Sequence, residues 1–196
     1  MRIIAGKYKG RVFFMPKAIR PTQDKVRKAL FDILGDIEGL SFLELFAGSG
    51  SVGFEAVSRG AGAVVFVENN RQCQQALERT IAFLKLKNCA VYPTEAETAI
   101  KRFHRDNKKF DLIFLDPPYF KEKVPRLRSG LAAAGMSDSL AKKALQTLKA
   151  YDILAPNGFI IAQCFRKESL PPTEGDLILF RQSRYGDTVL SFYKKG

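Results

Sequence analysis

Short apolar runs alternate with helical patterns along most of this chain. Runs at residues 41–46, 63–68, 89–93, 110–116 and 158–165 predict strands. The segments between them, at 48–60, 73–85, 97–105 and 139–154, repeat apolar positions at helical spacing. Strands that are apolar on both faces and separated by helices are typical of a parallel sheet in an α/β sandwich. The pattern therefore predicts a mostly parallel, doubly wound, Rossmann-like α/β fold.

The two ends of the chain depart from this alternation. Residues 2–14 are extended around a Gly-Lys-Tyr-Lys-Gly centre and predict a small basic β-hairpin. Residues 176–195 hold two β-rich runs around Tyr-Gly-Asp, which predict an antiparallel hairpin at the sheet edge. We expect two units, a basic hairpin and helix at 1–36 and the α/β domain at 37–196.

A helix is expected between the hairpin and the first sheet strand. Thr22 is a candidate N-cap for it. One face of this helix carries the apolar residues Val26, Ala29, Leu30, Ile33 and Leu34. Lys25, Arg27 and Lys28 lie off that face and are predicted to turn outward.

Positive charge is concentrated at the N-terminus. The chain has a net charge of +12, and residues 1–30 hold nine Lys or Arg against the single acid Asp24. Such a segment is the expected footprint of a protein that binds a phosphate backbone, although a solvated surface is the simpler alternative. The candidate RNA-binding residues are Arg2, Lys7, Lys9, Arg11, Arg20, Lys25, Arg27 and Lys28.

The composition argues against membrane, secreted and metal-binding proteins. No run of about 18 apolar residues is present to span a bilayer, and the start lacks the apolar stretch of a secretory signal, so we expect a cytoplasmic protein. Cys73, Cys89 and Cys164 are far apart and the chain has one histidine, His104. These spacings favour reduced thiols over a metal site, and we expect no metal.

A glycine-rich turn follows the predicted strand at 41–46. Gly48, Gly50 and Gly53 form the pattern G-x-G-x-x-G, and Glu68 ends the next strand, where it can accept the two hydroxyl hydrogens of a ribose. NAD and S-adenosylmethionine satisfy this pattern equally. Glu44, inside the strand before the glycines, favours S-adenosylmethionine because a carboxylate there can reach the amino group of its methionine part. Glu95 and Ala96, after the third strand, are placed to border the adenine.

The sequence FDLIFLDPPYF at residues 110–120 ends a buried strand with an acid, two prolines and a tyrosine. Proline lacks an N–H and restricts the residue before it, so this corner is rigid. Asp116 and the Pro117 carbonyl can accept hydrogen bonds from a flat amine, with Pro118 stiffening the turn and Tyr119 stacking on the amine's ring. In a doubly wound sheet this strand neighbours the first one, so both loops meet at the topological switch point.

ELFAGSG at 44–50, VENN at 67–70 and DPPY at 116–119 resemble the S-adenosylmethionine-dependent amino-methyltransferases. RIIAGKYKGR, RPTQDKVRKALFDIL, LELFAGSGSVGFEAVSRGA and RYGDTVLSFY are similar to the bacterial 16S ribosomal RNA guanine-N2 methyltransferases, RsmD-type. The resemblance implies methylation of a guanine N2 amine in 16S ribosomal RNA or the small subunit. It also places Arg20, Thr22, Phe46, Ala47, Asn69 and Asp116 at the cofactor. Separately, nothing in the sequence indicates an obligate partner, so we expect a monomer. Two departures from the family pattern are Gln163, where it has an acid, and residues 121–138.

Four other functions share some of these features. A DNA adenine-N6 methyltransferase would use the same corner, but 196 residues leave little room for a sequence-reading domain. Protein-glutamine methylation usually goes with Asn in place of Asp116. An NAD-dependent oxidoreductase shares the glycine turn but has no evident proton-transfer residue here. A non-catalytic RNA-binding protein would keep the basic residues without needing Glu44 or the DPPY corner.

Overall fold

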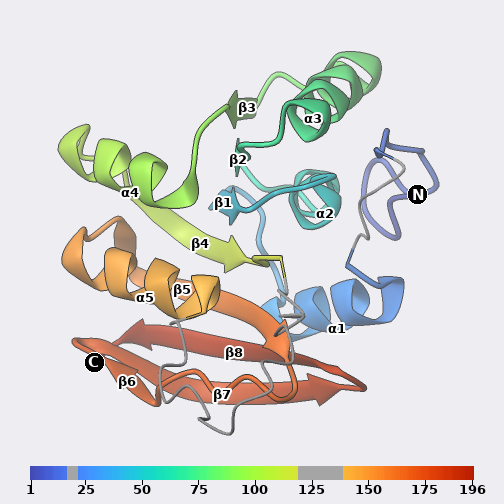
Figure 1. The fold of residues 1–196 in the computed structure, drawn as a ribbon. Helices are drawn as coiled ribbons and strands as arrows, with labels where there is room; N and C mark the ends of the chain where they lie inside the picture. The colour runs from blue at the N-terminus through green and yellow to red at the C-terminus, as the bar shows by residue number, and fades with distance from the viewer. Residues whose placement is uncertain (17–21, 119–138) are drawn as a thin grey trace, which may run out of the picture.

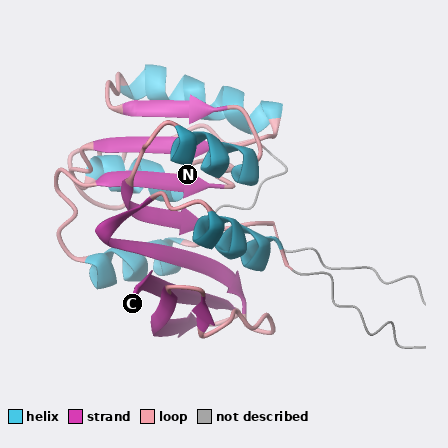
Figure 2. Cartoon of the chain, turned by 90° about the vertical axis from the view of Figure 1, so that its left-hand side faces the viewer, coloured by secondary structure: helices cyan, strands magenta, loops and turns pink. Residues whose placement is uncertain are grey.

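A computed structural model describes residues 1–16, 22–118 and 139–196. Within these ranges one sheet of eight strands is covered by helices on both faces (Figures 1 and 2). The helices are α1 (Asp24–Leu34), α2 (Ser51–Ser58), α3 (Arg71–Leu84), α4 (Ala96–Arg105) and α5 (Leu140–Ala150). The strands are β1 (Ser41–Leu45), β2 (Ala63–Val67), β3 (Cys89–Tyr92), β4 (Phe110–Leu115), β5 (Leu154–Phe165), β6 (Thr173–Glu174), β7 (Leu177–Tyr185) and β8 (Thr188–Lys195).

The strand order β3-β2-β1-β4-β5-β8-β7-β6 confirms the doubly wound prediction. β1 pairs in parallel with both β2 and β4, and β2 with β3 and β4 with β5 are also parallel. The chain therefore builds outward from β1 in one direction and then returns to its other side with β4. The carboxyl ends of β1 and β4 lie side by side at the switch point, as the sequence predicted.

The last strands reverse direction. β8 runs antiparallel to β5, and β7 antiparallel to β8, which confirms the predicted hairpin. The short strand β6 adds to β7 and was not predicted. The expected helix at 139–154 was too long, because α5 ends at Ala150 and Leu154 already pairs with Phe110. Asp152 makes this break: its carbonyl accepts from Lys109 and its carboxylate accepts from the Leu154 N–H.

Two apolar layers hold the helices to the sheet. α4 and α5 pack on one face through buried residues such as Ile100, Phe103 and Leu145. α1, α2 and α3 pack on the other face, where Phe54 packs against Phe66 with ring centroids 4.8 Å apart. In Figure 2 the two layers of helices lie in front of and behind the strands. No helix in the described part of the chain has the length and apolar character needed to cross a bilayer.

The N-terminal arm, residues 1–16, is held on the outside of α2 and α3. Its two sides meet as the hairpin prediction required, but they pair through the single bridge Arg2–Val12 and form no regular strands. The N–H groups of Ile4 and Ala5 donate to the Glu55 carboxylate at 2.8 and 3.0 Å. Further along, the Phe14 N–H donates to Thr80 of α3 at 3.0 Å. The backbone of the arm is thus anchored by acceptors on the helices beneath it.

Candidate active site

The loop between β1 and α2 turns through left-handed backbone conformations. Phe46, Gly48 and Gly50 have φ angles of 58°, 54° and 70°. This region strains a residue with a side chain, so Phe46 holds a conformation that only its surroundings can enforce. The Gly50 N–H donates to the Ala47 carbonyl at 2.7 Å and closes the turn. The loop therefore presents its backbone at the carboxyl edge of the sheet.

Two of the three glycines are required by packing inside the protein. A Cβ on Gly53 would lie 2.4 Å from the Phe66 ring and 2.7 Å from Glu44 Oε2. A Cβ on Gly50 would lie 2.4 Å from Leu77 Cδ2. At these two positions of the G-x-G-x-x-G pattern the fold itself leaves no room for a side chain.

Glu44 lies beneath this loop and is 3% exposed. Its Oε2 accepts from the Gly53 N–H at 2.8 Å, at the start of α2. Burial raises the pKa of Glu44 to about 8, and the nearby Asp116 acts in the same direction, whereas the hydrogen bonds from the α2 backbone oppose the shift. The acid is therefore poised to change protonation near neutral pH if a cation approaches it.

Glu68 links the loops that follow β1 and β2. Its Oε2 accepts from the Gly48 N–H and its Oε1 from the Asn70 N–H, both at 2.7 Å. Asn70 in turn caps α3 through its side chain, while Asn69 is exposed beside it. A carboxylate has about four acceptor positions, so Glu68 keeps capacity for hydroxyl donors. The sequence predicted this residue by its spacing, and the structure brings it to the glycine loop.

Asp116 follows β4 and receives two side chains from distant parts of the chain. Its Oδ2 accepts from Gln163 Nε2 at 2.7 Å and from Thr22 Oγ1 at 3.2 Å. Gln163 comes from β5 and Thr22 from the segment before α1. The prediction that Thr22 caps α1 was wrong: Gln23 occupies the N-cap, and the Thr22 hydroxyl is used at Asp116 instead.

The other predicted cofactor residues lie at the same edge of the sheet. Glu95 precedes α4 and is exposed, and Ala96 is buried behind it. Because β1 to β4 are parallel, the segments after each of them emerge side by side. Pro117 is buried and Pro118 is exposed at the end of β4. Arg20, Tyr119 and residues 121–138 lie outside the described residues.

One basic residue does not lie where the sequence placed it. Arg2, Lys7, Lys9, Arg11, Lys25 and Lys28 are exposed. Arg27 is fully buried, with Nη2 donating to the Arg2 carbonyl at 2.7 Å and Nε 3.7 Å from the Glu55 carboxylate. The prediction that Arg27 turns outward was therefore wrong. The helical face is wider than its apolar residues suggested, because the buried acid Glu55, which the sequence analysis missed, accepts this cation.

Burial limits the reactivity of the three cysteines. Cys73 and Cys164 are buried and Cys89 is half-buried. Burial raises the pKa of Cys73 to about 11 and that of Cys89 and Cys164 to about 12. Only the thiolate is a good nucleophile, so these side chains are unreactive near neutral pH.

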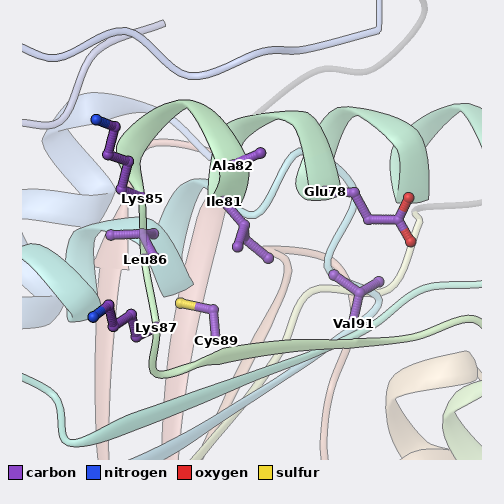
Figure 3. A pocket seen from close by; sticks show the side chains of 8 residues that line it. All are labelled: Glu78, Ile81, Ala82, Lys85, Leu86, Lys87, Cys89 and Val91. Atoms are coloured by element: carbon purple, nitrogen blue, oxygen red, sulfur yellow. The ribbon is translucent and has the colours of Figure 1, made fainter.

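A shallow groove lies on a different part of the molecule (Figure 3). It runs between the second half of α3 and the edge strand β3. The residues lining it are Glu78, Ile81, Ala82, Lys85, Leu86, Lys87, Cys89 and Val91. None of the described residues predicted to contact the cofactor or the acceptor amine lines this groove, so it is separate from the edge where the acids gather.

The fold and the position of these acids define the class of Rossmann-like methyltransferases. A hypothetical protein of Thermus thermophilus has the same fold, with a TM-score of 0.80 and 26% identity over 99% of both chains. A candidate methyltransferase solved as a complex with SAH has a TM-score of 0.64, covering 87% of this chain and 48% of that one. Its 17% identity shows the fold alone.

Residues 1–194 match the family model described as "Conserved hypothetical protein 95". The chain belongs to this family, that of the RsmD-type ribosomal RNA methyltransferases. YlbH of Bacillus subtilis, named as a candidate rRNA methyltransferase, is 37% identical over 203 residues, covering 100% of this chain and 99% of the relative. Ribosomal RNA small subunit methyltransferase D of Escherichia coli is 28% identical over 198 residues, covering 100% and 90%.

Proposed function

We propose that this protein transfers a methyl group from S-adenosylmethionine to the exocyclic N2 amine of a guanine in 16S ribosomal RNA. The observation that supports this best is the position of Asp116. It follows β4 directly beside the glycine loop of β1, and its Oδ2 is held by Gln163 and Thr22. An acceptor fixed at the switch point, next to a cofactor loop, suits a reaction between an amine and a bound methyl donor.

The residues of the glycine loop fit S-adenosylmethionine. Glu68 has acceptor capacity for ribose hydroxyls and lies at the Gly48 N–H. Glu44 is a buried acid with a raised pKa, which suits an ammonium group that would ionise it. Phe46, Ala47, Asn69, Glu95 and Ala96 complete the proposed cofactor site, with Arg20 and Thr22 closing it. When bound, S-adenosylmethionine supplies a methyl group on a positively charged sulfur.

The protein's part in the reaction is to orient the amine. A guanine amine is a weak nucleophile because its lone pair is shared with the ring. Asp116 and the Pro117 carbonyl accept its hydrogens and favour a pyramidal nitrogen with its lone pair directed at the methyl carbon, while Tyr119 stacks on the base. Aspartate, with an ordinary pKa of about 4, is too weak a base to ionise a neutral amine. The nitrogen therefore loses its proton after transfer, and catalysis comes from alignment.

The basic residues account for substrate binding in this proposal. A paired base cannot reach the corner at Asp116, so the target guanine is in a loop or is flipped out of its helix. Arg2, Lys7, Lys9, Arg11, Lys25 and Lys28 are exposed and grip phosphates around it. In this proposal residues 1–36 form the RNA-binding unit of a cytoplasmic monomer, and the arm at residues 1–16 is anchored on α2 and α3.

Methyl transfer from labelled S-adenosylmethionine tests this proposal. The substrates are hypomethylated small ribosomal subunits, naked 16S ribosomal RNA and DNA, with the product nucleosides identified by mass spectrometry. We expect N2-methylguanosine in the ribosomal substrates. N6-methyladenine in DNA would keep the chemistry and overturn the substrate, and the absence of transfer to all three would leave a binding protein on this fold.

A further inference from the structure

Gln163 lies in the middle of the sheet and contacts the proposed catalytic acid. It belongs to β5, pairs with Leu190 of β8 and is 5% exposed. Its Nε2 lies 2.7 Å from Asp116 Oδ2, a shorter contact than that of Thr22 with the same oxygen. Because β5 is hydrogen-bonded on both sides, by β4 and by β8, the amide is carried on a rigid element.

The two ends of this amide are in different situations. Nε2 donates to Asp116, whereas Oε1 is buried and has no hydrogen-bond partner among the described residues. A buried polar atom without a partner costs about 1–3 kcal/mol, so a residue needed only for packing would be apolar here. Turning the amide over would place Oε1 against a carboxylate oxygen, which repels it. The contact with Asp116 therefore fixes the orientation of the amide and gives a reason for its polarity.

The donor that Gln163 offers to Asp116 is uncharged. Among the described residues, Glu44 of β1 and Cys164 of β5 interact electrostatically with Asp116. The hydroxyl of Thr22, which also donates to Asp116 Oδ2, is uncharged as well. An amide steadies the carboxylate without adding a charge of either sign.

We propose that Gln163 is a positioning residue that holds the Asp116 carboxylate in the orientation required to accept the target amine. This inference rests on the proposed function, because it acts through Asp116. Gln163 itself touches neither cofactor nor substrate in this assignment. Its contribution is the single hydrogen bond from Nε2 to Oδ2.

Three variants separate positioning from packing. Gln163→Leu keeps similar volume and removes the donor. Gln163→Glu keeps the shape, and its carboxyl can donate to Asp116 only while the pair holds a proton. Gln182→Glu is the matched control, because it makes the same chemical change on β7, where Gln182 donates to Ser191 at 2.9 Å, outside the proposed site.

We expect Gln163→Leu to lower kcat by about 10- to 100-fold at every pH, the range for one hydrogen bond to a charged group. The affinity for S-adenosylmethionine, measured by calorimetry, should stay within about twofold. Gln163→Glu should be active at low pH and lose activity as pH rises, because two adjacent carboxyls share one proton that is then removed. The wild type and Gln182→Glu should lack this descending limb.

Two results would overturn the inference: wild-type kcat in Gln163→Leu, or a Gln163→Glu pH profile parallel to that of the wild type. Thermal unfolding of each variant shows whether a loss comes from the fold. If the wild type methylates no ribosomal substrate, the proposed function fails separately. In that case, ¹³C NMR of the Asp116 carboxyl still tests whether Gln163 positions Asp116. An unchanged titration of this carboxyl in Gln163→Leu would show that the amide does not hold the carboxylate.

Discussion

The two halves of the proposed site hold their acids in different ways. On the cofactor side, Glu44 and Glu68 accept from the backbone N–H groups of Gly53 and Gly48, which lie 9 and 20 residues away. On the acceptor side, Asp116 accepts from the side chains of Gln163 and Thr22, 47 and 94 residues away. The cofactor half is thus built by one strand-turn-helix unit and its neighbour, and the acceptor half by contacts across the whole fold.

This difference predicts which substitutions each half of the site tolerates. A backbone N–H is present whatever the side chain, so the donors to Glu44 and Glu68 persist as long as the loop keeps its path. Gln163 and Thr22 donate to Asp116 through their side chains, so either bond can be lost by a single substitution far away in the sequence. The acceptor half should therefore be the more easily altered part of the site, and the following changes test that contrast.

The largest effect is expected from Asp116→Ala. Removing the acceptor should lower methyl transfer by about 10³-fold or more, the upper range for one preorganised polar group, because the amine loses its orientation. Cofactor affinity should change little, since Glu44 and Glu68 keep their backbone donors. Single-turnover methylation and calorimetry measure the two quantities. Asp187→Ala, on an exposed acid paired with Arg166 at 2.9 Å, is the control, and near-normal turnover in Asp116→Ala would contradict the mechanism.

Next in size is the effect of Arg27→Met on stability. Glu55 is fully buried and would lose one of its cations, although Arg59 Nε at 3.0 Å and two backbone N–H groups remain. We expect a loss of about 2–4 kcal/mol in the free energy of unfolding, measured with urea. The same change at the adjacent Lys28, which is 65% exposed, should cost about 0.5 kcal/mol or less.

The variants Arg27→Met and Lys28→Met also distinguish a structural role from a role in RNA binding. Lys28→Met should weaken RNA binding and its salt dependence, whereas folded Arg27→Met should retain both. Stability losses of equal size at the two positions would contradict the burial of Arg27.

These contacts also mark how far the sequence could predict the structure. The parallel strands, the switch point and the glycine loop follow from local periodicity and spacing, and they were predicted. The burial of Arg27 was not, because its partner Glu55 lies 28 positions later and a cation on a helix normally indicates a solvated face. Gln163 was noticed only as a departure from a pattern. Its contact with Asp116 depends on the register of β5 against β4, which periodicity does not give.

A smaller effect is expected from reversing the charge of the arm in Lys7→Glu, Lys9→Glu, Arg11→Glu. These residues are exposed while the backbone of the arm is held by Glu55 and Ser58, so the fold should survive. Each lost phosphate contact should flatten the plot of log affinity against log salt by about 0.7 for single-stranded RNA, or about 2 in total. Lys101→Glu, Arg105→Glu, Lys143→Glu on α4 and α5 is the matched control. Equal slopes of log affinity against log salt for the two triple variants would show that the arm does not bind the RNA.

The smallest effect, taken per pH unit, concerns the proton on Glu44. Its pKa is about 8 in the folded protein and about 4.5 in the reference state, because burial disfavours the charge. The folded state therefore holds a proton that the unfolded chain releases, so the contribution of Glu44 to stability should be full below pH 4.5 and be lost as pH rises towards 8. The slope from one such group is at most about 1.4 kcal/mol per pH unit. Urea unfolding at several pH values should show this slope reduced in Glu44→Gln.

The same proton reports whether Glu44 serves the cofactor or only the loop. If the ammonium group of S-adenosylmethionine approaches the carboxyl, binding near pH 6.5 should release a large part of one proton, because an adjacent cation favours the ionised acid. Calorimetry in two buffers of different ionisation enthalpy measures that release, and Glu44→Gln should abolish it. If the heat of binding is independent of the buffer in both the wild type and Glu44→Gln, Glu44 only supports the start of α2 through its hydrogen bond with Gly53. Glu68 would then be the acid of the cofactor half that binds the ligand. Glu44, held by backbone N–H groups, would only support the loop, whereas Asp116, held by side chains, would still act as the acceptor for the amine.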